Sequence, residues 1–273
     1  MAEHSIKEII QKRHSVRNYD GRPLSQETID KIKDYIKDLT NPFDKKVRIE
    51  LIQHNSGNES IKLGTYGVIK GAKYFLAAAC EKDDLSLTTL GYSLEKLILY
   101  CTSLGLGTVW LGGTFNKGNF AKAINLKENE VLPIVSPVGY EGGKKSLFAK
   151  LAGKNTNKRN DFSQSFFNGD FNTPLTESDA GEYYEPLEML RLAPSAVNKQ
   201  PWRVLKQNNN IHFYLAETNK YTSMDIGIAL CHFHLTAMEN NLDGELKIND
   251  PKIGNNDLTY VMSWEKKNQF KWL

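Results

Sequence analysis

Two segments of the chain carry the same order of hydrophobic and polar positions. Each begins with a short apolar run, continues through a polar loop into a helix-length pattern, and ends at a glycine. The first segment spans residues 74–107 and the second spans residues 213–244. Gly91 and Gly227 open the two helical patterns, and the leucine three residues later also matches (227 − 91 = 136; 230 − 94 = 136). This self-similarity indicates two copies of one supersecondary unit.

Each unit is predicted to be a strand followed by an amphipathic helix. The first helix would place on one face the apolar residues at positions 90, 94, 97, 98 and 101. The aromatic and aliphatic runs before the helices are typical of strands. Ser25 and Thr176, each two residues after a proline, match as helix N-caps. Chance is the alternative, because any two amphipathic helices share apolar positions. The shared order favours a real duplication, whose halves would pack as a pseudo-two-fold pair.

No low-complexity linker divides the chain, so residues 1–273 are expected to form one compact unit. A polar, turn-rich stretch at residues 155–173 is predicted to connect the halves. The first half-fold is therefore expected at residues 1–160 and the second at residues 161–273. A hydrophobic fraction of 40% with 25% charged residues is ordinary for a globular protein with a real core.

The overall charge excludes some classes of partner. The chain has 35 Lys and Arg against 32 Asp and Glu, a net +3, which is too small to indicate a nucleic-acid or anionic-membrane protein. No apolar run reaches the roughly 18 residues of a transmembrane helix, and the N-terminal segment lacks the apolar region of a secretory signal. Three cysteines without a CxxC motif are typical of buried, reduced thiols. We therefore expect a cytoplasmic protein that acts on small molecules.

Two basic clusters are candidates for phosphate binding. Arg13 and Arg17 lie four residues apart with His14 and Ser15 between them, and arginine forks with a serine hydroxyl suit a phosphate. Lys158-Arg159, with Lys154 nearby, forms the second cluster. Taken singly, each cluster is better explained without a ligand, the first as a solvated helix end and the second as a solvated turn.

Two loops are candidates for contact with a planar ligand. Gly112 and Gly113 follow a short apolar run, and glycine lets backbone N–H groups approach a ring without a Cβ in the way. The alternative is a tight strand-to-helix turn. The run Pro194-Ser-Ala-Val-Asn-Lys-Gln-Pro-Trp202 brackets a polar loop with prolines, which would hold Ser195 and Asn198 rigidly. A plain helix–strand connection would not require so much rigid polarity.

Several catalytic motifs are missing from the sequence. Neither a P-loop, a complete dinucleotide-binding glycine motif nor a nucleophile elbow occurs. His232 and His234 are two residues apart on a predicted helix, so their side chains diverge and a shared metal is not expected. Phosphoryl transfer, triad chemistry and metal hydrolysis are therefore unsupported.

The set of motifs resembles the nitroreductase family of FMN-dependent oxidoreductases. The Arg13–Arg17 opening is similar to that family's phosphate-binding segment, and Pro194–Trp202 is similar to its flavin-contacting loop. Residues 104–113 and 135–140 resemble the segments beside the flavin ring. The resemblance implies an α+β fold with two antiparallel or mixed sheets flanked by helices.

The order of the motifs departs from the usual family member. There the proline–serine loop follows the arginine opening by a few tens of residues, and a homodimer completes each FMN site. Here the loop comes in the second half, and no equivalent stands near residues 39–47. This order resembles the single-chain, pseudo-dimeric nitroreductases. It implies one FMN per chain and a chain that is a monomer or a homodimer.

The resemblance also implies roles for individual residues. Arg13, Ser15 and Arg159 would bind the phosphate, Arg17 would approach the flavin N1 and O2, and the Gly112–Gly113 backbone would approach N5 or O4. The full set of implied FMN contacts is Arg13, His14, Ser15, Arg17, Leu111, Gly112, Gly113, Lys158, Arg159, Pro194, Ser195, Ala196 and Asn198.

The implied reaction needs no protein acid or base, because the flavin carries the chemistry. NAD(P)H would deliver hydride and leave, and an oxidised acceptor of nitroaromatic or quinone type would follow in a ping-pong scheme. Three alternatives stay open: an FMN-binding protein without turnover that senses or stores flavin, the same fold used for another reaction, and an interaction module without cofactor. Tyr66 and Lys70 are weaker candidates to line the site.

Overall fold

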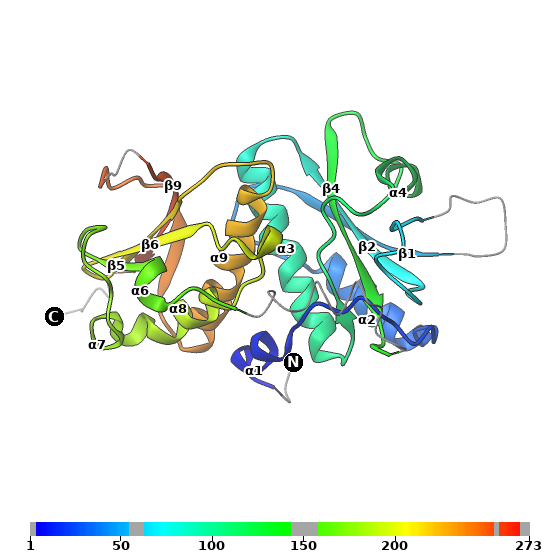
Figure 1. The fold of residues 1–273 in the computed structure, drawn as a ribbon, viewed down its shortest axis with the longest axis horizontal. Helices are drawn as coiled ribbons and strands as arrows, with labels where there is room; N and C mark the ends of the chain where they lie inside the picture. Colours follow the sequence, from blue (N-terminus) through cyan, green and yellow to red (C-terminus); the bar gives the residue numbers. More distant parts are fainter. Residues whose placement is uncertain (1–3, 55–62, 143–157, 254–256, 268–273) are drawn as a thin grey trace.

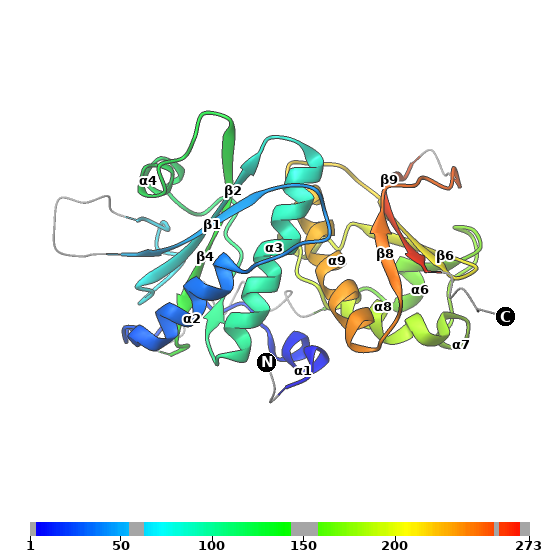
Figure 2. The same cartoon turned by 180° about the vertical axis from the view of Figure 1, so that it is seen from behind.

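Two β-sheets flank a central pair of long helices in the computed structural model of the chain (Figures 1 and 2). The structure describes residues 4–54, 63–142, 158–253 and 257–267. The central helices are α3 (Asp84–Ser103) and α9 (Thr222–Glu239), which lie side by side between the sheets.

The first sheet has the strand order β1-β2-β4-β3, and all its neighbouring strands are antiparallel. Its strands are β1 (Val47–Gln53), β2 (Tyr74–Glu81), β3 (Gly107–Thr108) and β4 (Glu130–Gly139). The helices of this part of the chain, besides α3, are α1 (Ile6–Lys12), α2 (Gln26–Lys37) and α4 (Lys117–Ala123).

The second sheet has the order β5-β6-β7-β9-β8. Its strands are β5 (Phe166–Asn168), β6 (Trp202–Gln207), β7 (Asn210–Leu215), β8 (Gly244–Lys247) and β9 (Thr259–Lys266). The helices that accompany it, besides α9, are α6 (Phe162–Ser165), α7 (Glu177–Ala180) and α8 (Tyr184–Arg191), with 3-10 turns at Gly181–Tyr183 and Ala196–Asn198.

The two sheets share one topology, which confirms the predicted duplication. The order β1-β2-β4-β3 corresponds strand for strand to β6-β7-β9-β8, and a long helix follows the second strand in both. The corresponding strands β2 and β7 each carry a register shift, at Ala78/Cys80 and at Phe213/Tyr214. Strand β5, which pairs in parallel with β6, is an addition to the second sheet.

The central helices cross at the two glycines that revealed the repeat. A Cβ on Gly91 would lie 2.2 Å from the carbonyl oxygen of Met224, and a Cβ on Gly227 would lie 2.0 Å from that of Thr88. These contacts are reciprocal, since both pairs of equivalent residues are separated by 136 positions (227 − 91; 224 − 88). Reciprocal contact is what the interface of an isologous dimer shows. The chain is thus a pseudo-dimer, with glycine at the closest approach of its two helices.

Several local predictions hold in the structure. Ser25 and Thr176 cap α2 and α7, where their hydroxyl oxygens accept hydrogen bonds from backbone N–H groups three residues later. The three cysteines are buried free thiols. The predicted turn-rich stretch at residues 155–173 is described only from residue 158, and there it contains α6 and β5. A tilted ring contact between Phe162 and Phe166 and the pairing of β5 with β6 order this stretch.

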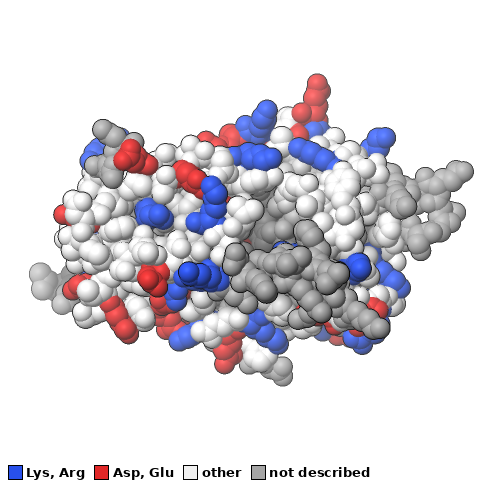
Figure 3. Space-filling model, in the orientation of Figure 1, with Lys and Arg blue, Asp and Glu red and all other residues white. Residues whose placement is uncertain are grey.

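Charge is mixed over the surface. Figure 3 shows Lys and Arg interspersed with Asp and Glu on the face drawn, without a large patch of one sign. Within the described ranges, no helix is long and apolar enough to span a bilayer.

Candidate functional site

The arginine opening runs from the end of α1 along the first sheet. Arg13 is the C-cap of α1, and two residues later Ser15 forms a parallel bridge with Thr108 of β3. The N–H of Val16 donates to the carbonyl of Thr108 at 2.8 Å. This close approach requires Gly107, because a Cβ there would lie 2.6 Å from Val16. The opening is therefore held in a fixed direction beside the sheet.

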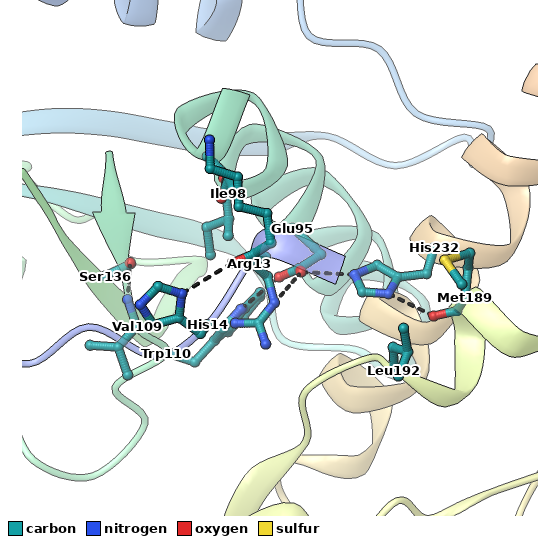
Figure 4. A network of polar contacts seen from close by, with 12 residues as sticks. Arg13, His14, Glu95, Ile98, Val109, Trp110, Ser136, Met189, Leu192 and His232 are labelled. Atoms are coloured by element: carbon teal, nitrogen blue, oxygen red, sulfur yellow. Dashed lines mark hydrogen bonds and ion pairs between the residues drawn. The ribbon is translucent and has the colours of Figure 1, made fainter. Parts of the chain in front are cut away.

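Arg13 points into the interior beside a buried carboxylate, as Figure 4 shows. Its side chain is 7% exposed, and its Nε lies 3.7 Å from the Oε1 of Glu95. Burial lowers the pKa of Arg13, while the charge of Glu95 opposes that shift. The Nε atom is buried and has no hydrogen-bond partner. Arg13 is thus a desolvated cation paired by charge rather than by hydrogen bonding.

Glu95 of α3 is fully buried and joins the two halves (Figure 4). Its Oε1 accepts from the Nε2 of His232 on α9 at 2.9 Å, and its Oε2 accepts from the indole N–H of Trp110 at 2.8 Å. Burial raises the pKa of Glu95, but His232, Arg13 and Trp110 outweigh that effect and hold the pKa below its usual value. Glu95 is therefore ionised in this network.

His232 is held at both ring nitrogens. Its Nδ1 lies 2.9 Å from the carbonyl oxygen of Met189. Its Nε2 lies 2.9 Å from the Oε1 of Glu95. The imidazole ring therefore links Glu95 to α8.

A second arginine, in the segment that connects the two halves, lies near Arg13. Arg159 donates to the Oδ1 of Asn198 at 3.0 Å and to the carbonyl of Leu192 at 2.9 Å. Burial, the charge of Arg13 and the charge of Arg191 lower the pKa of Arg159 to about 10. The structure thus brings together Arg13, Arg159 and Asn198, three of the residues that the sequence nominated.

The proline–serine loop is built around these contacts. The amide nitrogen of Asn198 donates to the carbonyl of Lys158 at 2.8 Å, and the Oγ of Ser195 accepts from the N–H of Gln200 at 2.9 Å. Val197, Asn198 and Gln200 have positive φ angles of 47°, 59° and 51°. Because a β-branched residue rarely adopts this conformation, the 88%-exposed Val197 stores backbone strain. The loop owes its shape to these left-handed residues and to its docking on Lys158 as well as to its prolines.

The first turn of α9 contacts both predicted ring-binding segments. The N–H of Ala196, in the proline–serine loop, donates to both carboxylate oxygens of Asp225, at 3.0 and 3.1 Å. Tyr221, the N-cap of α9, donates its hydroxyl to the carbonyl of Gly112 at 3.2 Å. A Cβ on Gly112 would lie 2.8 Å from the Tyr221 ring. Tyr221 therefore lies directly against the Gly112–Gly113 segment.

The other nominated residues are less closely gathered. His14 is exposed and pairs with Glu141 at 2.8 Å, and the Lys158 side chain is also exposed. Arg17 is half-buried, and burial lowers its pKa. Leu111 is buried and bridges to Val135 of β4, while Pro194 lies at the start of the docked loop.

Tyr66, Lys70 and Lys154 are the remaining residues that the sequence suggested for the site. Tyr66 is 71% exposed with a φ of 49°, and Lys70 bridges to Asn18 by its backbone. The backbone N–H of Lys70 also donates to the carbonyl of Arg17 at 3.0 Å, so this part of the chain lies beside the arginine opening. Lys154 lies outside the described residues.

Sequence reasoning missed Glu95, Trp110, Asp225 and Tyr221, and it considered His232 only as a metal ligand. For Glu95 a signal existed. It lies four residues after Gly91 and three before Ile98, so it shares their buried face of α3.

The chain matches one family of known proteins over most of its length. A family profile described as "Putative TM nitroreductase" matches residues 5–237. The chain belongs to this family. No curated protein matches it significantly.

The nitroreductase fold is also found in solved structures. A putative nitroreductase from Thermotoga maritima is 22% identical, covers 97% of this chain and 95% of its own, and has a TM-score of 0.64. A nitroreductase family protein from Clostridium difficile is 20% identical, covers 55% of this chain and 92% of its own, with a TM-score of 0.39. A nitroreductase with bound FMN from Desulfitobacterium hafniense is 16% identical, covers 53% and 93%, with a TM-score of 0.42.

Proposed function

We propose that this chain binds one FMN between its two halves and works as an FMN-dependent NAD(P)H oxidoreductase of the nitroreductase type. The observation that carries the proposal is the meeting of Arg13, in the first half, with Arg159, in the connecting segment, and with Asn198, in the second half. The family membership and the FMN-binding neighbour support the same cofactor.

The charges of the buried network fit a phosphate. Arg13 and Arg159 contribute two positive charges and Glu95 one negative charge, so these three groups sum to +1 (2 − 1). A phosphate monoester carries roughly −1.5 to −2 charges at pH 7. An anion of this charge would offset the positive charge of a cluster in which two arginines otherwise repel each other.

Different residues of the chain would bind the phosphate and the ring of the cofactor. Arg13 and Arg159 would grip the phosphate, and Ser15 would supply a hydroxyl donor. The Pro194–Asn198 loop and the Gly112–Gly113 backbone would bracket the ring, with Arg17 adding positive charge near its pyrimidine edge. His14, Leu111 and Lys158 would lie at the margin of the site. When bound, FMN would supply the two-electron chemistry, so no protein acid or base is required.

A second candidate function is FMN binding without turnover, as in flavin sensing or storage. One observation favours it: the Tyr221 ring occupies the space beside Gly112 and donates its hydroxyl to that carbonyl. A tyrosine in this place would restrict access of a nicotinamide or an acceptor to the ring.

Anaerobic mixing of the FMN-loaded protein with NADH or NADPH separates the two candidates. For an oxidoreductase we expect loss of the oxidised-flavin absorbance with one of the two nucleotides and its return on adding a quinone or nitroaromatic. Failure of both nucleotides would count against the oxidoreductase. In that event, reduction that appears in Tyr221→Ala but not in Tyr221→Phe, which keeps the ring, would identify Tyr221 as the block.

A further inference from the structure

Glu95 is the one acid in contact with the arginine that the proposed function places on the phosphate, among the described residues. It is 0% exposed and sits one helical turn from Gly91, where α3 and α9 approach most closely. A buried carboxylate is costly unless it is fully paired. Its retention at the centre of the pseudo-dimer therefore calls for a specific role.

The hydrogen bonds of Glu95 leave Arg13 free to bind an anion. The two oxygens of Glu95 are taken by His232 and Trp110, at 2.9 and 2.8 Å. Arg13 is 3.7 Å away, too far for a hydrogen bond, so Glu95 fixes its direction by charge alone. The buried Nε of Arg13 has no hydrogen-bond partner, and the guanidinium donates to no other described residue. Its guanidinium is thus oriented while its donors are uncommitted.

The same carboxylate is linked to the second arginine. The His232 ring lies between Glu95 and the carbonyl oxygen of Met189 on α8 and contacts both. Three residues beyond Met189, the carbonyl of Leu192 accepts from Arg159. Glu95 therefore connects both predicted phosphate-binding arginines through rigid helices.

We propose that Glu95 is a positioning residue that orients Arg13 toward the phosphate of the flavin and so sets the preference of the site for FMN over riboflavin. This inference rests on the proposed function, because it takes FMN as the ligand. Glu95 itself would not touch the cofactor.

Replacement of Glu95 by glutamine separates positioning from net charge. Glutamine keeps the size of the side chain and removes its negative charge, and by charge alone this change would favour phosphate binding. A loss of preference for FMN would therefore report that Arg13 has lost the partner that orients it. Ordering one long side chain costs about 0.5–1.5 kcal/mol, which corresponds to roughly twofold to tenfold in affinity.

The experiment measures the dissociation constants of FMN and riboflavin for the apoprotein by quenching of flavin fluorescence. We expect the wild-type chain to prefer FMN strongly, and Glu95→Gln to reduce the FMN/riboflavin preference by roughly twofold to tenfold. Riboflavin affinity should change little, because riboflavin lacks the phosphate. General damage to the fold would weaken both ligands and leave the ratio unchanged.

Two further variants show whether Glu95 acts through Arg13. In an Arg13→Ala background, the Glu95→Gln change should no longer alter the ratio, as expected when one residue acts through another. Tyr92→Phe is the matched control, because it removes another α3–α9 hydrogen bond, from Tyr92 to His234 at 2.8 Å. This control should keep the wild-type ratio.

The outcomes separate this inference from the function on which it rests. If the wild-type chain binds FMN with a phosphate preference that Glu95→Gln leaves intact, the positioning role is wrong and the proposed function stands. An equal loss in Tyr92→Phe, or a full Glu95→Gln effect without Arg13, would also overturn it. If the wild-type chain does not bind FMN at all, the proposed function itself fails.

Discussion

Alanine at Gly91 should force the two central helices apart. The added Cβ would lie 2.2 Å from the carbonyl oxygen of Met224, whereas ordinary contacts of a Cβ begin near 3.4 Å. The backbone must therefore separate locally by about 1.2 Å (3.4 − 2.2). No side chain can rotate out of the way, because both sides of the contact are helix backbone.

The expected cost follows from what that separation disturbs. Overpacking of a well-packed core costs about 1–3 kcal/mol. Separation also stretches the buried contact of Glu95 with His232, now 2.9 Å, and a broken buried pair costs about 3–5 kcal/mol. The helix propensity of alanine returns up to about 1 kcal/mol. Because the contact is stretched and not broken, only a part of those roughly 3–5 kcal/mol is lost, and we expect a net loss of about 2–4 kcal/mol in the free energy of unfolding.

Urea unfolding followed by circular dichroism would measure this loss. Gly118→Ala in α4 is the matched control, because a Cβ there meets its nearest neighbour at 3.7 Å, so it reports helix propensity without a clash. Gly227→Ala should cost about as much as Gly91→Ala, given its reciprocal contact with Thr88. The double variant should lose less than the sum, by at least ~0.5 kcal/mol, because the first separation relieves the second clash.

The reasoning would be refuted by a Gly91→Ala protein as stable as the Gly118→Ala control. It would also be refuted by strictly additive losses in the double variant, since the two clashes would then be independent. Either result would mean that the central helices do not cross at these glycines.

Two other predictions concern the first turn of α9. Burial raises the pKa of Asp225 to about 7, compared with 3.8 for the unfolded carboxyl. The hydrogen bond from the Ala196 N–H lowers this pKa, and the charge of Glu217 raises it further. The folded chain thus holds a proton that the unfolded chain releases, so stability falls as pH rises from about 4 to 7. Asp225→Asn should flatten this slope, by at most about 4 kcal/mol across the window, in urea unfolding at both pH values; an unchanged slope would contradict the assignment. Tyr221→Phe removes the hydrogen bond to Gly112 and should lower stability by about 1 kcal/mol, measured as a lower melting temperature; a melting temperature equal to wild type would show that the bond contributes nothing.

The duplication was predictable because both copies have a glycine at the helix crossing. Gly91 and Gly227 stand at the same place in two helical patterns, and the structure shows why: each lets the other helix approach. The strand order was not predictable in the same way. Pairing of β2 with β4 across α3 joins residues 49 (130 − 81) to 64 (138 − 74) positions apart, and nothing local in the sequence encodes such a choice.

The site was predictable only in part. Arg13, Arg159 and Asn198 stood out because their runs concentrate charge and polarity, and the structure brings them together. Glu95 did not stand out, because a glutamate in an amphipathic helix usually faces solvent. His232 was considered for a metal and dismissed, and its role beside Glu95 depends on the helix crossing.

The stoichiometry of flavin binding tests the central claim most directly. Apoprotein of known concentration, titrated with FMN under tight-binding conditions and followed by fluorescence quenching, should saturate at one FMN per chain. Only one side of the pseudo-dimer has the arginine opening with a facing proline–serine loop; on the other side, the segment between α2 and β1 places Phe43 against Tyr92. Saturation at two FMN per chain, or no saturable binding, would contradict the account.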